Sequence, residues 1–143
     1  MTTPREYLLE KLYDAYRLER KALRILNVAQ HMARLCPRLR GRLRDHADET
    51  KWQVRLLEVC LENLGEKPRT WRAGWGLPPA HTGIALKRRE ITAYRELLSA
   101  AEAAGEAEVA QVAREILAQE IAMVSWLEDY HYPAAATRVG ALS

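Results

Sequence analysis

The fold of this chain is best predicted from one stretch of its sequence, Arg44-Asp45-His46-Ala47-Asp48-Glu49-Thr50-Lys51-Trp52-Gln53. It lies inside a pattern of residues that recur in steps of four and three, which places them on one face of a helix. The positions on that face are Leu39, Leu43, His46, Thr50, Gln53, Leu57, Cys60 and Leu64. The ends of this face are apolar and its middle is polar, and an unpaired polar group in a core costs about 1–3 kcal/mol. We therefore expect the rest of the chain to supply polar partners or a metal ion.

Outward from this stretch, the composition indicates one all-α domain. The chain has 143 residues, no Phe, and many strong helix formers without runs of β-branched residues. We expect the domain to span residues 1–133 and to be followed by a mobile tail over residues 134–143. The net charge of +3 is too small to predict a nucleic-acid partner by itself. Cys36 and Cys60 lie in no metal or redox spacing.

The N-terminal part of the chain carries no targeting signal. It lacks the charged-then-apolar layout of a signal peptide. No apolar run approaches the roughly 20 residues of a membrane span. We therefore expect a cytoplasmic protein that has no membrane contact.

Four helices follow from the spacing of apolar residues and from the positions of Pro and Gly. The first begins with a capping box at Thr3 and ends near Leu35, before Pro37. The others are expected from about Pro37 to Leu64, Thr82 to Ala104 and Glu106 to His131.

The segment from Gly65 to Thr82 is the only long irregular stretch, with three Gly and three Pro in eighteen residues. Eighteen extended residues can span up to about 60 Å, whereas a helix of about 25 residues is about 37 Å long. The segment can therefore cross the whole length of a four-helix bundle and leave the second and third helices parallel. We expect Trp71 and Trp75 to hold it against the surface. A loose connection between antiparallel neighbours is the alternative.

Each expected helix carries one glutamate at or beside its apolar face, near mid-length: Glu19, Glu49, Glu90 and Glu120. Four carboxylates close together need protonation, an internal cation or a bound metal. Di-metal helix bundles use one Glu from each of two helices and Glu-x-x-His from each of the others. Here Trp52 and Met123 stand where those histidines would be, and His46 precedes Glu49 instead.

The candidate metal ligands are Glu19, His46, Glu49, Glu90 and Glu120. A carboxylate-rich site of this kind suits iron or manganese. No Ser or Cys stands beside a plausible His, so we assign no catalytic nucleophile and leave open whether the protein is an enzyme.

The chain resembles the YciE/YciF-type ferritin-like proteins of bacteria from about Leu8 to Leu127. The resemblance is carried by Leu12-Tyr-Asp-Ala-Tyr-x-x-Glu19, His46-x-x-Glu-Thr-x-x-Gln53, Leu64-Gly-Glu-Lys-Pro68, Glu90-Ile-x-Ala-Tyr94 and Leu117-x-x-Glu120. It implies a ferritin-like four-helix bundle with a long crossover between helices 2 and 3, and a di-metal centre. It also implies association into dimers or larger assemblies, and a link to stress responses.

The third helix departs from the family pattern Glu-His-x-Glu-Ile, because it reads Lys87-Arg-Arg-Glu90-Ile91. Val124 likewise stands where the family has an acidic residue. Lys87 lies three residues before Glu90 on the same face, so its ammonium group can replace a metal charge. A complete di-metal site, a weakened or single-metal site, and a metal-free polar core all remain open. We expect partial occupancy by iron or manganese, or none.

Three functions are compatible with these residues. The first is a metalloprotein that acts on peroxide or stores metal. The second is a non-catalytic bundle that assembles with itself or with a paralogue. The third is an anion or nucleic-acid binder that uses Arg34 to Arg44 together with Lys87 to Arg89. Nucleic acid is the least favoured partner, because no aromatic residue is interleaved with these basic residues.

Overall fold

The computed structural model describes residues 1–69 and 83–131, and within these ranges it contains four α-helices and no strand. The helices are α1 (Pro4–Met32), α2 (Pro37–Asn63), α3 (Gly83–Ala103) and α4 (Ala107–His131). The expected all-α four-helix architecture is thus confirmed. Trp71, Trp75 and the expected tail over residues 134–143 lie outside the described residues. None of these helices combines the length and the apolar character of a membrane span.

The helix ends are set by local signals in the sequence. The Thr3 hydroxyl accepts a hydrogen bond from the Glu6 N–H at 3.1 Å, and the Glu6 carboxylate accepts one from the Thr3 N–H at 3.1 Å. This reciprocal pair satisfies donors that a helix start leaves free. Pro37 opens α2, where the missing N–H costs nothing. Gly65 and Gly105 follow α2 and α3 with φ of 81° and 70°, which favour glycine.

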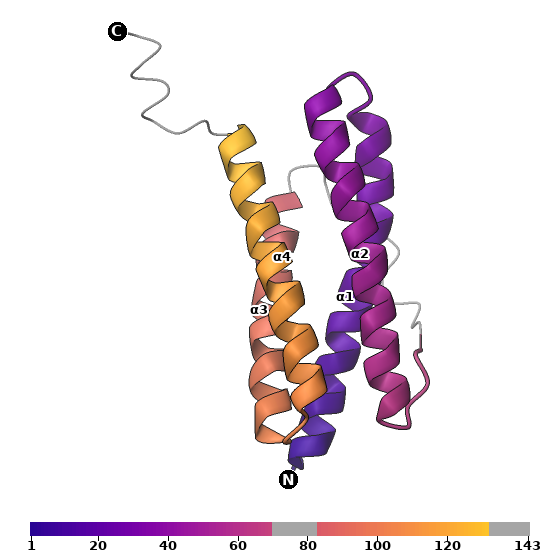
Figure 1. Cartoon of the computed structure of the whole chain (residues 1–143), viewed down its shortest axis with the longest axis vertical. Coiled ribbons are helices and arrows are strands. Elements are labelled where there is room, and N and C mark those ends of the chain that lie inside the picture. Colours follow the sequence, from indigo (N-terminus) through magenta and orange to yellow (C-terminus); the bar gives the residue numbers. More distant parts are fainter. Residues whose placement is uncertain (70–82, 132–143) are drawn as a thin grey trace, which may run out of the picture.

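The helices form a bundle in which α1 packs against α2 and α3, and α4 packs against α3 and α2. This places α2 and α3 on a diagonal of the bundle. Figure 1 shows that α1 and α4 run in one direction while α2 and α3 run in the other. The second and third helices are therefore parallel, as a crossover requires, and residues 70–82 of the connection lie outside the described part.

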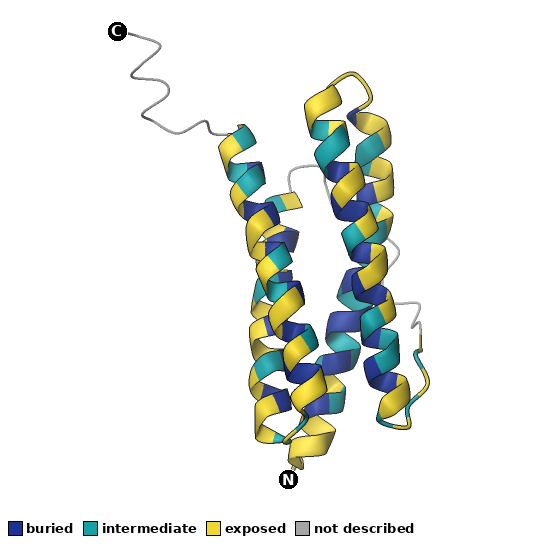
Figure 2. Cartoon of the chain, viewed as in Figure 1, coloured by how far each residue is buried: buried dark blue, intermediate teal, exposed yellow. Residues whose placement is uncertain are grey.

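Buried residues line the inward faces of all four helices (Figure 2). They form two apolar clusters, one of which contains Leu8, Leu12, Leu57, Leu97 and Ile116, and the other Leu26, Leu43, Ala47, Met123 and Leu127. A polar layer lies between the clusters and consists of Glu19, His46, Thr50, Gln53, Lys87, Glu90 and Glu120. The apolar residues at both ends keep this layer buried, where an unpaired charge is costly.

Candidate functional site

Three glutamates meet at the centre of the polar layer. Glu19 from α1, Glu90 from α3 and Glu120 from α4 are all fully buried. One carboxylate oxygen of each lies within 4.8 Å of the others. Each glutamate occupies a position of its helix where the apolar periodicity calls for a core residue, which is why the three point inward together.

Lys87 is the cation of this centre. It is 4% exposed, and its Nζ lies 3.1 Å from Glu90 Oε2 and 3.0 Å from Glu120 Oε2. The pair with Glu90 spans one turn of α3 and follows from the sequence spacing. The pair with Glu120 joins α3 to α4 and depends on the fold. The ammonium group therefore bridges two of the three buried carboxylates.

The protonation states of the centre differ between its carboxyl groups. Burial and the nearby Glu120 raise the pKa of Glu19 to about 8. Burial also raises the pKa of Glu90 well above its ordinary value, against the effect of Lys87. Burial opposes ionisation of Glu120 too, but the facing His46 and Lys87 outweigh it and hold the pKa of Glu120 at about 2.

Lys87 itself stays charged. Burial disfavours its ammonium form, but Glu90, Glu120 and Glu19 outweigh this effect, and the pKa of Lys87 lies above its ordinary value. The directions of these pKa shifts favour an ion pair between Lys87 and Glu120 and disfavour ionisation of Glu19 and Glu90. This arrangement balances charge inside the core without a metal ion.

Polar side chains from other helices orient the carboxyl groups. The Tyr94 hydroxyl donates to Glu19 Oε1 at 2.8 Å. The Gln53 amide satisfies its surroundings when its NH₂ group donates to Glu19 Oε2 at 3.0 Å and to Glu120 Oε1 at 3.1 Å. In this orientation the Gln53 carbonyl oxygen lies 2.6 Å from the side-chain amide of Gln119 and accepts a hydrogen bond when the Gln119 NH₂ group is turned toward it. These contacts fix Glu19 and Glu120 without using Lys87.

His46 and Glu49 lie at the α2 side of the centre. The fully buried His46 ring places Nδ1 at 3.1 Å from Glu49 Oε1 and Nε2 at 3.6 Å from Glu120 Oε2. The Glu49 side chain is 31% exposed and also pairs with Arg42 at 3.2 Å. Glu49 therefore lies at the edge of the polar layer and outside the three-carboxylate group. Of the five predicted ligands, the structure brings together Glu19, Glu90 and Glu120, with His46 beside Glu120.

Sequence reasoning missed two partners in this layer. Gln119 precedes Glu120 and is off the apolar face of α4, so nothing in the spacing indicated that it would reach Gln53. Arg42 belongs to a run of arginines and is expected from the sequence to face solvent, yet it pairs with Glu49. Tyr94, four residues after Glu90, was visible as a neighbour of the face, but its bond to Glu19 was not.

The donor set fits one metal ion better than two. Three carboxylates can ligate a single cation. Within the described residues, His46 Nε2 and Glu90 Oε1 are buried without a hydrogen-bond partner, so two donor atoms are free. A second ion would need ligands where Trp52 and Met123 stand, and Trp52 is 61% exposed. The residues therefore do not fit a di-metal centre, and a single ion would have to displace the Lys87 ammonium group.

These features define an all-α four-helix bundle protein with a buried carboxylate centre. The chain belongs to the family described as "Domain of unknown function (DUF892)", which matches residues 3–74 and 80–139. It is similar to a crystallised protein from Xanthomonas campestris pv. campestris, with 32% sequence identity and a TM-score of 0.82. That likeness covers 98% of this chain and 97% of the Xanthomonas chain.

Proposed function

We propose that this protein is a ferritin-like protein of the YciE/YciF type whose carboxylate centre is degenerate, because an internal lysine takes the place of metal charge. The observation that carries the proposal is the position of Lys87 Nζ, 3.0 Å from Glu120 and 3.1 Å from Glu90. A metal ion and this ammonium group would compete for the same oxygen atoms. Iron or manganese therefore binds weakly and below two ions per chain.

We assign no catalytic role to any residue of this centre. Redox chemistry at a di-metal carboxylate site depends on two ions held by a complete ligand set, and Trp52 and Met123 offer no such ligands. Glu19, Glu90 and Glu120 then act as a charge-balanced layer that can accept one cation when Lys87 moves aside. His46, next to Glu120, is the additional donor for that cation.

Elemental analysis of the purified protein tests this proposal. The protein is expressed with iron or manganese in the medium, passed through a desalting column without chelator, and analysed for metal per chain. We expect well under two ions per chain. Two tightly retained ions per chain would overturn the degenerate-site proposal and favour a working metalloprotein.

A second proposal concerns assembly, and Trp52 supports it. This large side chain is 61% exposed on α2, and aromatic residues of this kind are enriched in protein interfaces. We propose that the protein forms a homodimer or a larger homo-oligomer, with a paralogue as the alternative partner. Light scattering of the wild type and of Trp52→Lys tests it, with Lys51→Ala as a control on the same helix. A monomeric wild type would contradict homo-assembly.

The resemblance to the YciE/YciF type further supports a stress-associated role in the cytoplasm. The test is the abundance of the protein in cells of its source before and after peroxide or osmotic shock, together with cell fractionation. Unchanged abundance under both shocks would remove this part of the proposal.

A further inference from the structure

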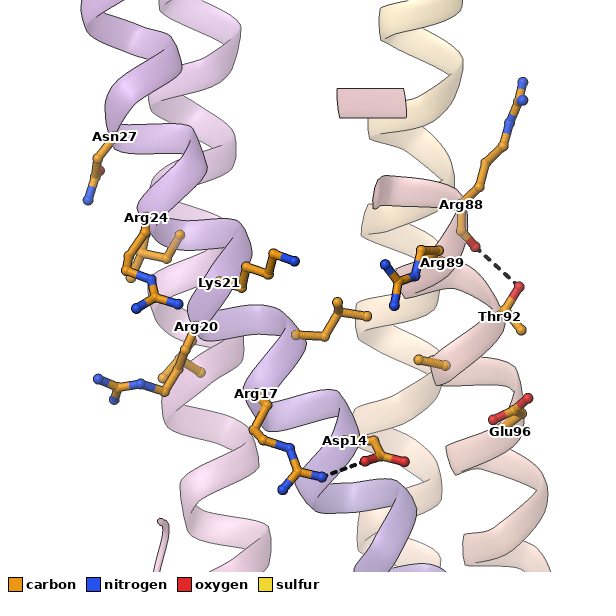
Figure 3. A pocket seen from close by; sticks show the side chains of 14 residues that line it. Asp14, Arg17, Arg20, Lys21, Arg24, Asn27, Arg88, Arg89, Thr92 and Glu96 are labelled. Atoms are coloured by element: carbon orange, nitrogen blue, oxygen red, sulfur yellow. Dashed lines mark hydrogen bonds and ion pairs between the residues drawn. The ribbon is translucent and has the colours of Figure 1, made fainter. Parts of the chain in front are cut away.

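A basic groove of about 880 Å³ follows the outer side of α1 next to α3, separate from the carboxylate centre (Figure 3). Its lining consists mainly of α1 and α3 residues, with Val54 from α2. Leu18, Val54 and Ala93 contribute apolar surface, and the polar ends of the longer side chains project around it.

Positive charge is concentrated in this groove. Six lining residues are basic (Arg17, Arg20, Lys21, Arg24, Arg88 and Arg89) and two are acidic (Asp14 and Glu96). The Arg88 guanidinium points away from the groove in Figure 3 and pairs with Glu128, so the other seven charged residues leave an excess of three positive charges, as large as the net charge of +3 of the entire chain. The remainder of the protein is therefore close to neutral, and the groove is the site where an anion would accumulate.

The repeated spacing makes the groove electrostatically costly when it is empty. Arg17, Lys21 and Arg24 follow one another at intervals of four and three residues, so they share one side of α1. Like charges at this spacing destabilise a helix by about 0.2–0.5 kcal/mol per pair. Salt bridges of 4 Å or less relieve part of this repulsion. Two of the groove cations form one: Arg17 pairs with Asp14 at 2.6 Å, and Arg88 pairs with Glu128 at 2.7 Å.

Four of the cations have no acidic partner of this kind among residues 1–69 and 83–131. They are Lys21, Arg24, Arg89 and Arg20, of which Arg20 donates to the Tyr16 hydroxyl at 3.2 Å. The acidic Glu96 is bound by Lys11 at 3.2 Å. Figure 3 shows Lys21 of α1 and Arg89 of α3 directed toward one another across the groove. Two cations from different helices that face one another attract a negative group more strongly than either does alone.

We propose that this groove binds a compact anion that carries several phosphate groups. Five of the six cations are arginines, whose planar guanidinium groups bind phosphate oxygens in pairs. The volume is in the range of small-molecule sites, about 300–1,000 Å³. No aromatic side chain of the described ranges lines the groove, although single-stranded nucleic acid sites depend on aromatic stacking. A small polyphosphate group matches these features better than a nucleic acid does.

This groove differs from the arginine run between Arg34 and Arg44. In that run Arg38 lies over the rings of Trp126 and Tyr130, at 5.7 and 5.9 Å, and Arg42 pairs with Glu49. These contacts use the cations to hold α2 in place. Within the described part of the chain, Lys21 and Arg89 have no ion pair or ring contact of this kind, so they are the better candidates for binding a ligand.

Isothermal titration of the full chain with inorganic tripolyphosphate tests the proposal. We expect saturable binding of one tripolyphosphate per chain that weakens as salt rises. The double variant Lys21→Ala/Arg89→Ala should bind about tenfold or more weakly, because it removes two charge-assisted contacts. The control Lys51→Ala/Arg95→Ala removes the same charge from exposed positions outside the groove, and its affinity should stay within about twofold of the wild type.

Two further arms make the outcome decisive. Circular dichroism must show the same helix content and melting behaviour for both double variants, since Lys21 and Arg89 are surface residues. Inorganic phosphate should bind more weakly than tripolyphosphate at the same salt concentration. Equal losses in the two double variants, or no saturable tripolyphosphate binding, would overturn the proposal. If a single-stranded oligonucleotide binds more tightly than tripolyphosphate, and the Lys21→Ala/Arg89→Ala variant loses this binding, the ligand of the groove is a nucleic acid and not a small anion.

Discussion

The Nζ atom of Lys87 on α3 lies 3.0 Å from Glu120 Oε2 on α4, so an ammonium group and a carboxylate neutralise each other inside the bundle. Both side chains are almost completely buried, with 5% and 0% exposure. A buried pair of this kind gives little net stability compared with an apolar core, but loss of one partner leaves an uncompensated charge. The pair therefore determines the charge of the centre, and under the proposed function it competes with a metal ion.

Lys87→Glu should increase metal uptake. The substitution removes the competing ammonium group and adds a fourth carboxyl group beside Glu90 and Glu120, and such a group of acids must either be protonated or bind a cation. Manganese per chain, measured by elemental analysis after desalting, should rise above the wild-type value. Manganese should also raise the melting temperature of this variant more than that of the wild type. Arg95→Glu, an exposed change of the same charge on α3, is the control, and an equal rise in both variants would contradict the competition.

Lys87→Met should destabilise the fold by about 3–5 kcal/mol, because it leaves the ionised Glu120 without its buried partner. The double variant Lys87→Met/Glu120→Gln should recover most of this loss, because it removes both charges. Urea unfolding at neutral pH measures the two free energies of unfolding. If the double variant is as unstable as Lys87→Met, the loss comes from packing rather than from an unpaired charge.

The pH dependence of stability should carry the signature of Glu19. An unfolded glutamate releases its proton near the ordinary pKa of 4.5, whereas Glu19 in the core keeps it until a pKa of about 8. Between these values the folded state binds more protons than the unfolded state, so the contribution of Glu19 to stability falls as pH rises. Glu19→Gln resembles the protonated acid and should remove this fall.

The measurement is the difference in unfolding free energy between Glu19→Gln and the wild type from pH 4.5 to 8.5. We expect the variant to gain relative to the wild type as pH rises. Glu96→Gln, an exposed change on α3, provides the baseline for removal of a carboxyl group. A difference that does not change with pH across this range would mean that Glu19 is ionised in the core.

The sequence predicted the bundle well because its signals are local. The alternation of four and three along α2 located Leu43, His46, Gln53 and Leu57 on one buried face. The capping box at Thr3 marks the start of α1, and Gly65 with its positive φ marks the end of α2. The sequence pattern predicts both ends within about one residue of their observed positions. The same periodicity put Glu19, Glu90 and Glu120 in the core at similar depth, which the structure confirms.

What the sequence could not supply was the set of contacts at the edges of these faces and between helices. Glu49 lies only three residues from His46, yet it turns toward Arg42 at the edge of the bundle. The reach of Lys87 to Glu120 likewise depends on the packing of α3 against α4. The basic groove could not be predicted either, since Lys21 and Arg89 are 68 positions apart and meet only because α1 lies beside α3.

Tyr94→Phe should shift the titration of Glu19 without unfolding the protein. The Tyr94 hydroxyl donates to Glu19 Oε1 at 2.8 Å, and this bond favours the ionised carboxylate, so its loss moves the pKa of Glu19 further above about 8. The unsatisfied oxygen should also cost about 1–3 kcal/mol of stability. Because Phe keeps the ring that fills the core, the apolar packing is retained. Measured from pH 7 to 9.5, the decrease in unfolding free energy should therefore end at a lower pH in the wild type than in the variant. In the Glu19→Gln background, Tyr94→Phe should leave the pH dependence unchanged, and a shift that persists there would assign the effect to another group.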